Sequence, residues 1–228
     1  ELTYEYTVEN RLKAVYDADD LLVAMAYDGD GNRIFQLNYN LHTDDDWQEN
    51  SGGGNGNNKD NQGNGGNISG ILFPEDGEVS ALEEELIGLI KTTGKQKDYE
   101  LIQYINDVNQ ENAEVLLELN INGTMDTAYS YGNERLTVER YDGWTGYYTY
   151  DPRGSVSGVT GDEGYLWASY RYDPFGEPTF GRTQYNNIYA YNGESYNPNI
   201  SAIYLRARYY STETASFLTE DSYLGDIT

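Results

Sequence analysis

Residues 27–33 read YDGDGNR, and the same scheme returns at residues 150–154 as YDPRG and at residues 172–176 as YDPFG. In each stretch a tyrosine closes an alternating segment, an aspartate follows it, and a glycine comes three residues after the aspartate. Aspartate accepts hydrogen bonds from backbone N–H groups two residues on, and glycine supplies a positive φ. Each stretch therefore predicts a strand, a tight turn and the start of the next strand.

The Tyr-Asp pair is a repeated unit. It also occurs at residues 16–17 and 141–142, and the spacing between the first two pairs is 11 residues, against 22 between the last two. A short β repeat cannot bury a face alone and must stack with its neighbours. The copies are too few for a closed solenoid, so we expect the chain to be a piece of a longer protein.

Composition agrees with a β-protein. The chain has 228 residues, of which 24 are Tyr and 25 are Gly, and 14% are aromatic. Tyrosine favours strands and glycine marks turns. The mean hydropathy is −0.75, but the aromatic content argues against general disorder. The sequence predicts a mainly β fold with an antiparallel sheet whose faces carry tyrosines.

Charge and residue types exclude several functions. Lys and Arg number 14 against 39 Asp and Glu, which gives a net charge of −25. This balance argues against binding to nucleic acid or to an anionic membrane surface, since both need a basic face. The chain has no Cys and one histidine, His42, which excludes thiolate metal sites and disfavours a Ser-His-Asp triad. No apolar run approaches the roughly 20 residues of a membrane span. We expect no cofactor and no membrane insertion by this segment.

The spacing Asp28-x-Asp30-x-Asn32 resembles the start of a calcium loop. An EF-hand then requires glycine at the sixth position and glutamate at the twelfth. These positions hold Arg33 and Tyr39, so a turn is the preferred interpretation and calcium the alternative.

The chain divides into three zones by composition. Tyrosine-rich strands are expected over 1–40, an insertion over 41–128, and a return to tyrosine-rich strands over 129–228. Within the insertion, residues 51–70 hold eight Gly and six Asn, as in a flexible linker. Helical periodicity follows over 78–110, with a first helix from Ser80 and a second after Asp98, while 116–121 could continue it or form a strand. We expect a helical decoration on the sheet that leaves and re-enters it at neighbouring strands. The apolar positions that suggest the helices are Val79, Leu82, Leu86, Leu89, Leu101, Ile102, Ile105 and Val108.

The last hundred residues contain an ordered series of motifs. They are YYTYDPRGSV at 147–156, YRYDPFG at 170–176, YAYNGE at 189–194, IYLRARYY at 203–210 and FLTEDSYLGD at 217–226. This series resembles the Rhs repeat-associated core domain, which closes the YD-repeat (Rhs) shell of polymorphic toxins. The same architecture occurs in the C subunits of insecticidal Tc toxins and in teneurins. The resemblance covers 1–40 as repeats and about 129–228 as the core.

The resemblance implies a fold and a function. In this family YD repeats form a long antiparallel sheet that winds into a hollow shell, and the core closes one end. The polypeptide after the core is a toxin held inside, and in many members the core is an aspartyl autoprotease that cuts the toxin free. The implied partners are the protein's own C-terminal toxin domain and neighbouring YD repeats, and the implied location is secreted or at the cell surface.

The resemblance assigns the first catalytic carboxylate to Asp221. The family commonly has proline after this aspartate, where this chain has Ser222. The second carboxylate belongs to an Asp-Pro-x-Gly-type motif farther downstream, next to the bond that is cut. Residues 222–228 hold no such motif, and Asp226 does not match it. The 228 residues alone are therefore not expected to cut themselves. The alternative for Asp221 is a turn residue before Gly225.

Arg206 and Arg208 lie two apart, so on a strand they would share one face. One of them could support the carboxylate pair, and Arg208 is the candidate. The alternative is structural ion pairing with acidic residues, which is preferred for Arg206.

Two other functions stay open. An extracellular adhesion or glycan-binding protein could stack sugars on its tyrosines, although cross-strand pairing explains the same residues. A filament scaffold would have neither cargo nor cleavage. Trp47, Trp144 and Trp167 are expected to be packing residues rather than a binding row.

Overall fold

The computed structural model describes residues 1–39, 99–110, 112–120, 122–183 and 187–221. These residues form two antiparallel sheets, one of twelve strands and one of four, in which each strand lies beside its neighbour in sequence. The mainly β, antiparallel fold is thus confirmed. Within the described residues no helix is long and apolar enough to cross a membrane.

The strand bounds follow the turns of the sequence. The large sheet consists of β1 (Leu2–Tyr6), β2 (Leu12–Asp17), β3 (Asp20–Tyr27), β4 (Arg33–Tyr39), β5 (Tyr99–Asp107), β6 (Glu114–Leu119), β7 (Met125–Tyr131), β8 (Arg135–Arg140), β9 (Thr145–Tyr150), β10 (Val156–Gly161), β11 (Leu166–Tyr172) and β12 (Pro178–Thr183). A 3-10 turn, η2 (Tyr191–Gly193), leads into the small sheet of β13 (Ser195–Asn197), β14 (Ala202–Leu205), β15 (Arg208–Ser211) and β16 (Ser216–Phe217).

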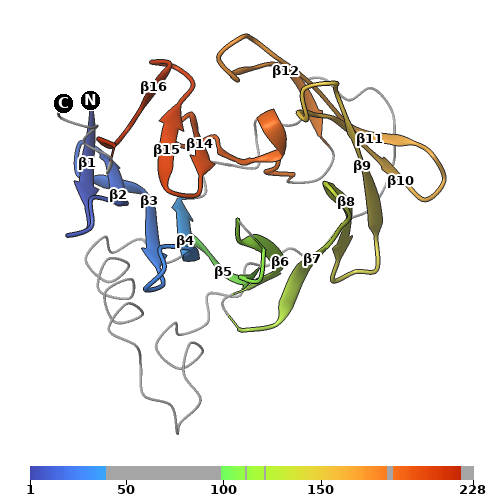
Figure 1. The fold of residues 1–228 in the computed structure, drawn as a ribbon, viewed down its shortest axis with the longest axis horizontal. Coiled ribbons are helices and arrows are strands. Elements are labelled where there is room, and N and C mark those ends of the chain that lie inside the picture. Colours follow the sequence, from blue (N-terminus) through green and yellow to red (C-terminus); the bar gives the residue numbers. More distant parts are fainter. Residues whose placement is uncertain (40–98, 111, 121, 184–186, 222–228) are drawn as a thin grey trace, which may run out of the picture.

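The large sheet follows an open curve, and the small sheet lies inside it (Figure 1). One hydrophobic cluster joins the two sheets, because Val15 and Val23 of the first strands pack with Ala202 and Tyr209 of the small sheet. A second cluster covers β8 to β11 and includes Tyr189, which precedes η2. The first cluster therefore holds the small sheet against β2 and β3, and the second holds the segment that leads into the small sheet.

The Tyr-Asp stretches form the predicted turns. The Oδ1 atom of Asp151 accepts hydrogen bonds from the N–H groups of Arg153 at 2.8 Å and Ser155 at 3.0 Å. The backbone closes the same three-residue loop, and Gly154 takes a φ of +84° at its third position. This is the type I turn with a glycine bulge that is common in hairpins. Asp28 accepts from Asp30 and Asn32 in the same way, so the turn interpretation of 28–32 is confirmed.

The tyrosine before such a turn ties its strand to the preceding one. Its hydroxyl donates to a backbone carbonyl oxygen at the start of that strand, at 2.6–2.8 Å. Before Tyr-Asp turns the pairs are Tyr27 with Leu12, Tyr150 with Arg135 and Tyr172 with Val156. Tyr131, which is followed by Gly132, makes the same bond with Val115. The tyrosine periodicity therefore has a structural cause in hydrogen bonding.

The prediction of a helix after Asp98 is wrong, because Tyr99–Asp107 is strand β5. It pairs with β4 from Tyr39↔Tyr99 to Phe35↔Gln103. The misleading spacing arises because both faces of β5 are used: Leu101 packs in one cluster with Leu37, and Tyr104 faces the other way, against Arg33. Apolar residues three apart lie on opposite faces of a strand, whereas on a helix they share one.

Residues 114–119 form strand β6, so the strand alternative for this region is confirmed. The chain leaves the sheet after β4 and re-enters it at the adjacent strand β5, as expected for an insertion. β5 and β6 nevertheless lie within residues 41–128, which were expected to be outside the sheet. The first expected helix and the Gly/Asn-rich linker lie outside the described residues. The division into three zones remains a prediction.

Candidate functional site

Arg208 and Asp221 come together at one end of the small sheet. Arg208 begins β15, and after β16 the chain runs back along that strand, with the Leu218 N–H donating to the Tyr209 carbonyl at 2.9 Å. This path brings Asp221 to the start of β15, where its Oδ2 atom lies 3.0 Å from Arg208 Nη2. The structure thus joins the two residues that the sequence singled out.

An aromatic ring fixes the arginine. The guanidinium carbon of Arg208 lies 3.7 Å from the ring centroid of Phe217 in β16, a cation–π contact that orients its plane. The Arg208 side chain is 24% exposed and the Asp221 side chain 55% exposed. The arginine is held and partly covered, while the carboxylate stays accessible to a second group.

The segment that carries Asp221 is anchored through Leu218. The Tyr6 hydroxyl of β1 donates to the Leu218 carbonyl oxygen at 2.7 Å, and Leu218 packs against the cluster between the two sheets. The Thr219 hydroxyl is buried without a hydrogen-bond partner among the described residues. Sequence reasoning missed Phe217 and Thr219, because it placed the chemistry on charged residues alone.

Arg206 does not share a face with Arg208, which corrects the expectation from their spacing. Leu205 pairs with Arg208, so Arg206 and Ala207 form a two-residue hairpin loop. Arg206 takes a φ of +58°, and its side chain reaches Glu114 at 2.9 Å and also Glu194. The structural ion-pair interpretation of Arg206 is confirmed.

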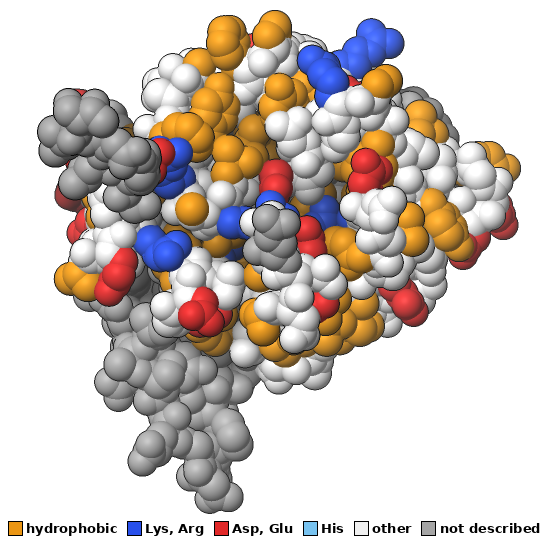
Figure 2. Space-filling view, in the orientation of Figure 1, with side chains coloured by type: hydrophobic (Ala, Val, Ile, Leu, Met, Phe, Trp, Pro, Cys, Tyr) orange, Lys and Arg blue, Asp and Glu red, His pale blue; other side chains and the backbone are white. Residues whose placement is uncertain are grey.

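These ion pairs line a cleft of about 670 Å³ between strand ends of the large sheet and the small sheet. Arg135 enters the network through Glu114, with 3.7 Å between Nη2 and Oε2, and donates to the Gly193 carbonyl at 3.0 Å. Burial raises the pKa of Glu194, and the nearby Arg206 opposes that shift. Figure 2 shows basic and acidic side chains meeting near the middle of this face.

A second arginine, Arg33, connects the sheets from within. It is 3% exposed and lies between the rings of Tyr104 and Tyr204, at 4.4 and 4.3 Å. Its Nη1 atom donates to the Tyr209 hydroxyl at 2.8 Å and its Nη2 atom to Ser195 at 3.2 Å. Since Tyr209 follows Arg208, Arg33 fixes the strand that presents the candidate site. The position of Arg33 in the sequence, directly after a Tyr-Asp turn, did not predict this role.

Glu118 is a buried carboxyl on the inner face of β6. Its side chain accepts a hydrogen bond from the Tyr129 hydroxyl at 3.0 Å, and the residue is 8% exposed. Burial raises the pKa of Glu118 to about 7, although the hydrogen bond from Tyr129 and the charge of Arg33 both act to lower it. This group changes charge near neutral pH, although the sequence gave no reason to select it.

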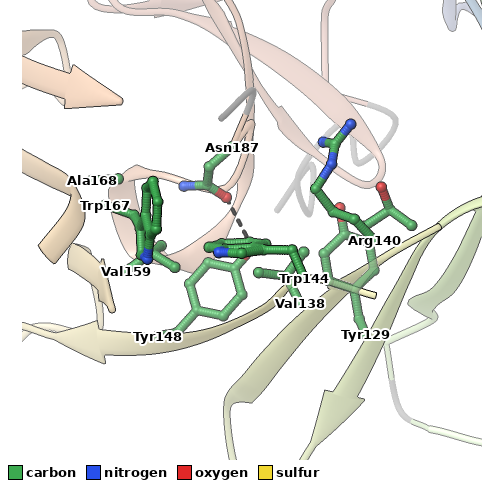
Figure 3. A pocket seen from close by; sticks show the side chains of 10 residues that line it. Tyr129, Val138, Arg140, Trp144, Tyr148, Val159, Trp167, Ala168 and Asn187 are labelled. Atoms are coloured by element: carbon green, nitrogen blue, oxygen red, sulfur yellow. Dashed lines mark hydrogen bonds between the residues drawn. The ribbon is translucent and has the colours of Figure 1, made fainter. Parts of the chain in front are cut away.

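Two of the three tryptophans pack as expected. Trp144 and Trp167 meet edge to face at 5.9 Å, over Gly146 and Gly161, which pair across β9 and β10. A Cβ at Gly146 would lie 2.5 Å from the Trp144 ring, and one at Gly161 would collide with Trp167. Beside them the Tyr148 hydroxyl donates to Asn187 at 2.8 Å (Figure 3).

The cavity around these rings measures about 20 Å³, which is room for about one water molecule. Aromatic cover of strand glycines explains the arrangement, and a sugar ring does not fit. Trp47 lies outside the described residues.

Two kinds of known protein are similar to this chain. The tRNA3(Ser)-specific nuclease WapA of Bacillus spizizenii is 31% identical over 113 residues, which is 47% of this chain and 5% of that protein. The tRNA nuclease WapA of Bacillus subtilis is 29% identical over the same length. No family model matches the chain.

The fold matches solved toxin structures. The crystal structure of TcdB2-TccC3 has a TM-score of 0.56 at 13% identity, over 97% of this chain and 9% of that one. The Photorhabdus luminescens Tc holotoxin pore also gives 0.56, at 12% identity over 98% of this chain and 9% of that one. The resemblance found in the sequence is thus confirmed as distant similarity to WapA and as the fold found in Tc toxins. The chain spans about 5% of the curated relatives and 9% of the solved chains.

Proposed function

We propose that this chain, which is distantly similar to WapA and has the fold found in Tc toxins, is a structural segment of an Rhs-type toxin shell. In the intact protein the shell encloses and delivers a C-terminal toxin. The segment also presents Asp221 as one carboxylate of an aspartyl autoprotease that separates this toxin from the shell. The protein acts outside the producing cell, as a secreted or surface-attached particle.

The observation that carries the cleavage proposal is the Arg208–Asp221 contact of 3.0 Å. The two residues are thirteen apart in the sequence, and the backbone path along β15 brings them together. An arginine that donates to one oxygen and stacks on Phe217 holds the carboxylate in one place. A fixed carboxylate is what a site needs if it must meet a second group supplied by another segment.

Cleavage at such a site needs two carboxyl groups that share one proton. The ionised carboxyl takes a proton from a water molecule, whose oxygen attacks the carbonyl carbon of the scissile peptide bond. The protonated carboxyl gives its proton to the carbonyl oxygen. When the tetrahedral intermediate collapses, the C–N bond breaks, the nitrogen takes up a proton, and both carboxyls return to their starting state. Asp221 supplies one of the two, and the second comes from the downstream motif expected from the resemblance.

Arg208 is proposed as the electrostatic support of this pair. Its fixed positive charge favours the state in which one of two adjacent carboxyls is ionised. Replacing it with glutamine removes the charge and keeps part of the side-chain volume.

The experiment is expression of the natural full-length protein with and without Asp221→Asn, followed by size exclusion under native conditions. The proposal predicts that the wild type elutes as one particle that separates into two polypeptides only on denaturation, because the freed toxin stays enclosed. Asp221→Asn and Arg208→Gln should elute at the same volume as one uncut polypeptide. A wild-type protein that stays uncut would contradict the cleavage role, and a toxin fragment that elutes separately would contradict enclosure.

A further inference from the structure

We propose that Arg206 is a positioning residue that clamps the hairpin between β14 and β15 to the large sheet and so sets where Arg208 meets Asp221. The clamp is independent of the proposed function, whereas the effect of the clamp on cleavage rests on the proposed function.

The hairpin loop directs the Arg206 side chain away from the strand. The loop has two residues, and Arg206 has a left-handed backbone that residues other than glycine, asparagine and aspartate rarely adopt. This conformation turns its guanidinium out of the small sheet and toward β6. Arg208, at the start of the next strand, is thereby left to contact Phe217 and Asp221.

The guanidinium joins two elements of the fold. Its Nη2 atom pairs with Glu114 at the start of β6 at 2.9 Å, and its Nη1 atom pairs with Glu194, which follows η2. The Nε atom donates to the Ala113 carbonyl oxygen at 3.4 Å. The planar arginine fork can make all these contacts from one position, whereas the single ammonium group of lysine cannot.

A buried arginine contacts one of the two carboxylates and the backbone beside the other. Arg135 in β8 has a side chain only 5% exposed, and it faces the second oxygen of Glu114 at 3.7 Å. It also donates to the carbonyl of Gly193, the residue before Glu194. Both segments that Arg206 contacts are therefore also tied to Arg135 in β8, which fixes the hairpin tip to the large sheet.

The tip and the candidate site are close along the chain. Arg208 comes two residues after Arg206, at the end of a hairpin whose strands have only four residues each. Further along β15, Tyr209 is held by Arg33 at 2.8 Å. Movement of the tip would therefore displace Arg208 before the rest of β15. It would change the contact of Arg208 with the segment that carries Asp221.

The first test is hydrogen exchange by mass spectrometry on the full-length protein with Arg206→Gln. We expect at least fivefold faster exchange in peptides that cover 205–208 and 217–221, with Arg206→Lys between this variant and the wild type. The control is Arg153→Gln, since Arg153 is 63% exposed and pairs with Asp151 inside its own turn. Wild-type exchange in both segments of Arg206→Gln would overturn the clamp.

The second test is the rate at which cut polypeptide appears after pulse-labelled synthesis. We expect Arg206→Gln to slow cleavage about tenfold and Arg206→Lys to recover part of the rate. Gly164→Ala serves as a destabilised control, since Gly164 lies in the turn between β10 and β11 with a φ of +77° and a Cβ there would meet nothing within 4 Å. It should cleave at the wild-type rate, and equal slowing in Gly164→Ala and Arg206→Gln at equal melting temperature would contradict positioning. If the wild type and Asp221→Asn both stay uncut, the proposed function fails, and the exchange comparison still decides whether the clamp exists.

Discussion

The Tyr27 hydroxyl donates a hydrogen bond to the Leu12 carbonyl oxygen at 2.6 Å, across the ends of two adjacent strands. The same bond recurs at Tyr131, Tyr150 and Tyr172. The aspartate of a Tyr-Asp pair therefore shapes the turn, and the tyrosine locks the strand before it. Four of the 24 tyrosines make this bond, which phenylalanine could not make.

Tyr27→Phe should destabilise the protein, because it keeps the buried ring and leaves the Leu12 carbonyl without its donor. The expected loss in unfolding free energy is about 1–2 kcal/mol, measured by chemical denaturation. The matched control is Tyr165→Phe, since Tyr165 is 67% exposed, and it should change stability by less than about 0.5 kcal/mol. Equal effects of the two substitutions would show that the hydroxyl of Tyr27 contributes nothing.

Gly154→Ala should also destabilise, through the backbone alone. Gly154 has a φ of +84°, and a Cβ there would meet nothing within 4 Å. A left-handed alanine costs about 1–2 kcal/mol, so the melting temperature should fall without any steric clash. Gly29→Ala is the control, since that glycine is equally open and its φ lies outside the positive range. A melting temperature of Gly154→Ala equal to that of Gly29→Ala would argue against the bulged turn.

Glu118 should make stability depend on pH. Its pKa is raised from 4.5 to about 7 in the folded protein, so the folded state holds this proton more tightly than the unfolded state. The contribution of Glu118 to stability is full below pH 4.5 and is lost as pH rises through about 7. The loss is of the order of 3 kcal/mol.

Glu118→Gln keeps the shape of the neutral carboxyl and cannot ionise. We expect the difference in unfolding free energy between this variant and the wild type to grow in favour of the variant from pH 5 to pH 8. Glu139→Gln, on an exposed position of β8, should leave the wild-type pH profile unchanged. A Glu118→Gln protein with the same pH profile as the wild type would mean that Glu118 does not titrate in this range.

The sequence predicted the sheet and its turns well, because Asp at the turn and Gly at its third position act locally. It failed at β5, where Leu101 and Tyr104 occupy opposite faces of a strand covered on both sides. No single-sequence period separates that pattern from a helix. Contacts between residues distant in sequence could not be predicted either. The contact of Arg206 with Glu114 spans 92 positions, and only the folded curve of the large sheet brings the two together.

The candidate site was predicted in part. Asp221 was identified by resemblance and Arg208 as one of two arginines that could support it, and the two lie in contact at 3.0 Å. The stacking of Arg208 on Phe217 depends on how β16 returns along β15, which local sequence does not specify. The loop conformation of Arg206 was missed because the spacing rule for strands was applied across a hairpin turn.

The most direct test of the account is the intact mass of the natural full-length protein, compared with its Asp221→Asn and Glu220→Gln variants. We predict two masses that sum to the full chain plus one water for the wild type and for Glu220→Gln, and a single uncut mass for Asp221→Asn. Cleavage of the Asp221→Asn protein to the same two masses would contradict the role of Asp221, and a single uncut mass in all three would contradict autoproteolysis.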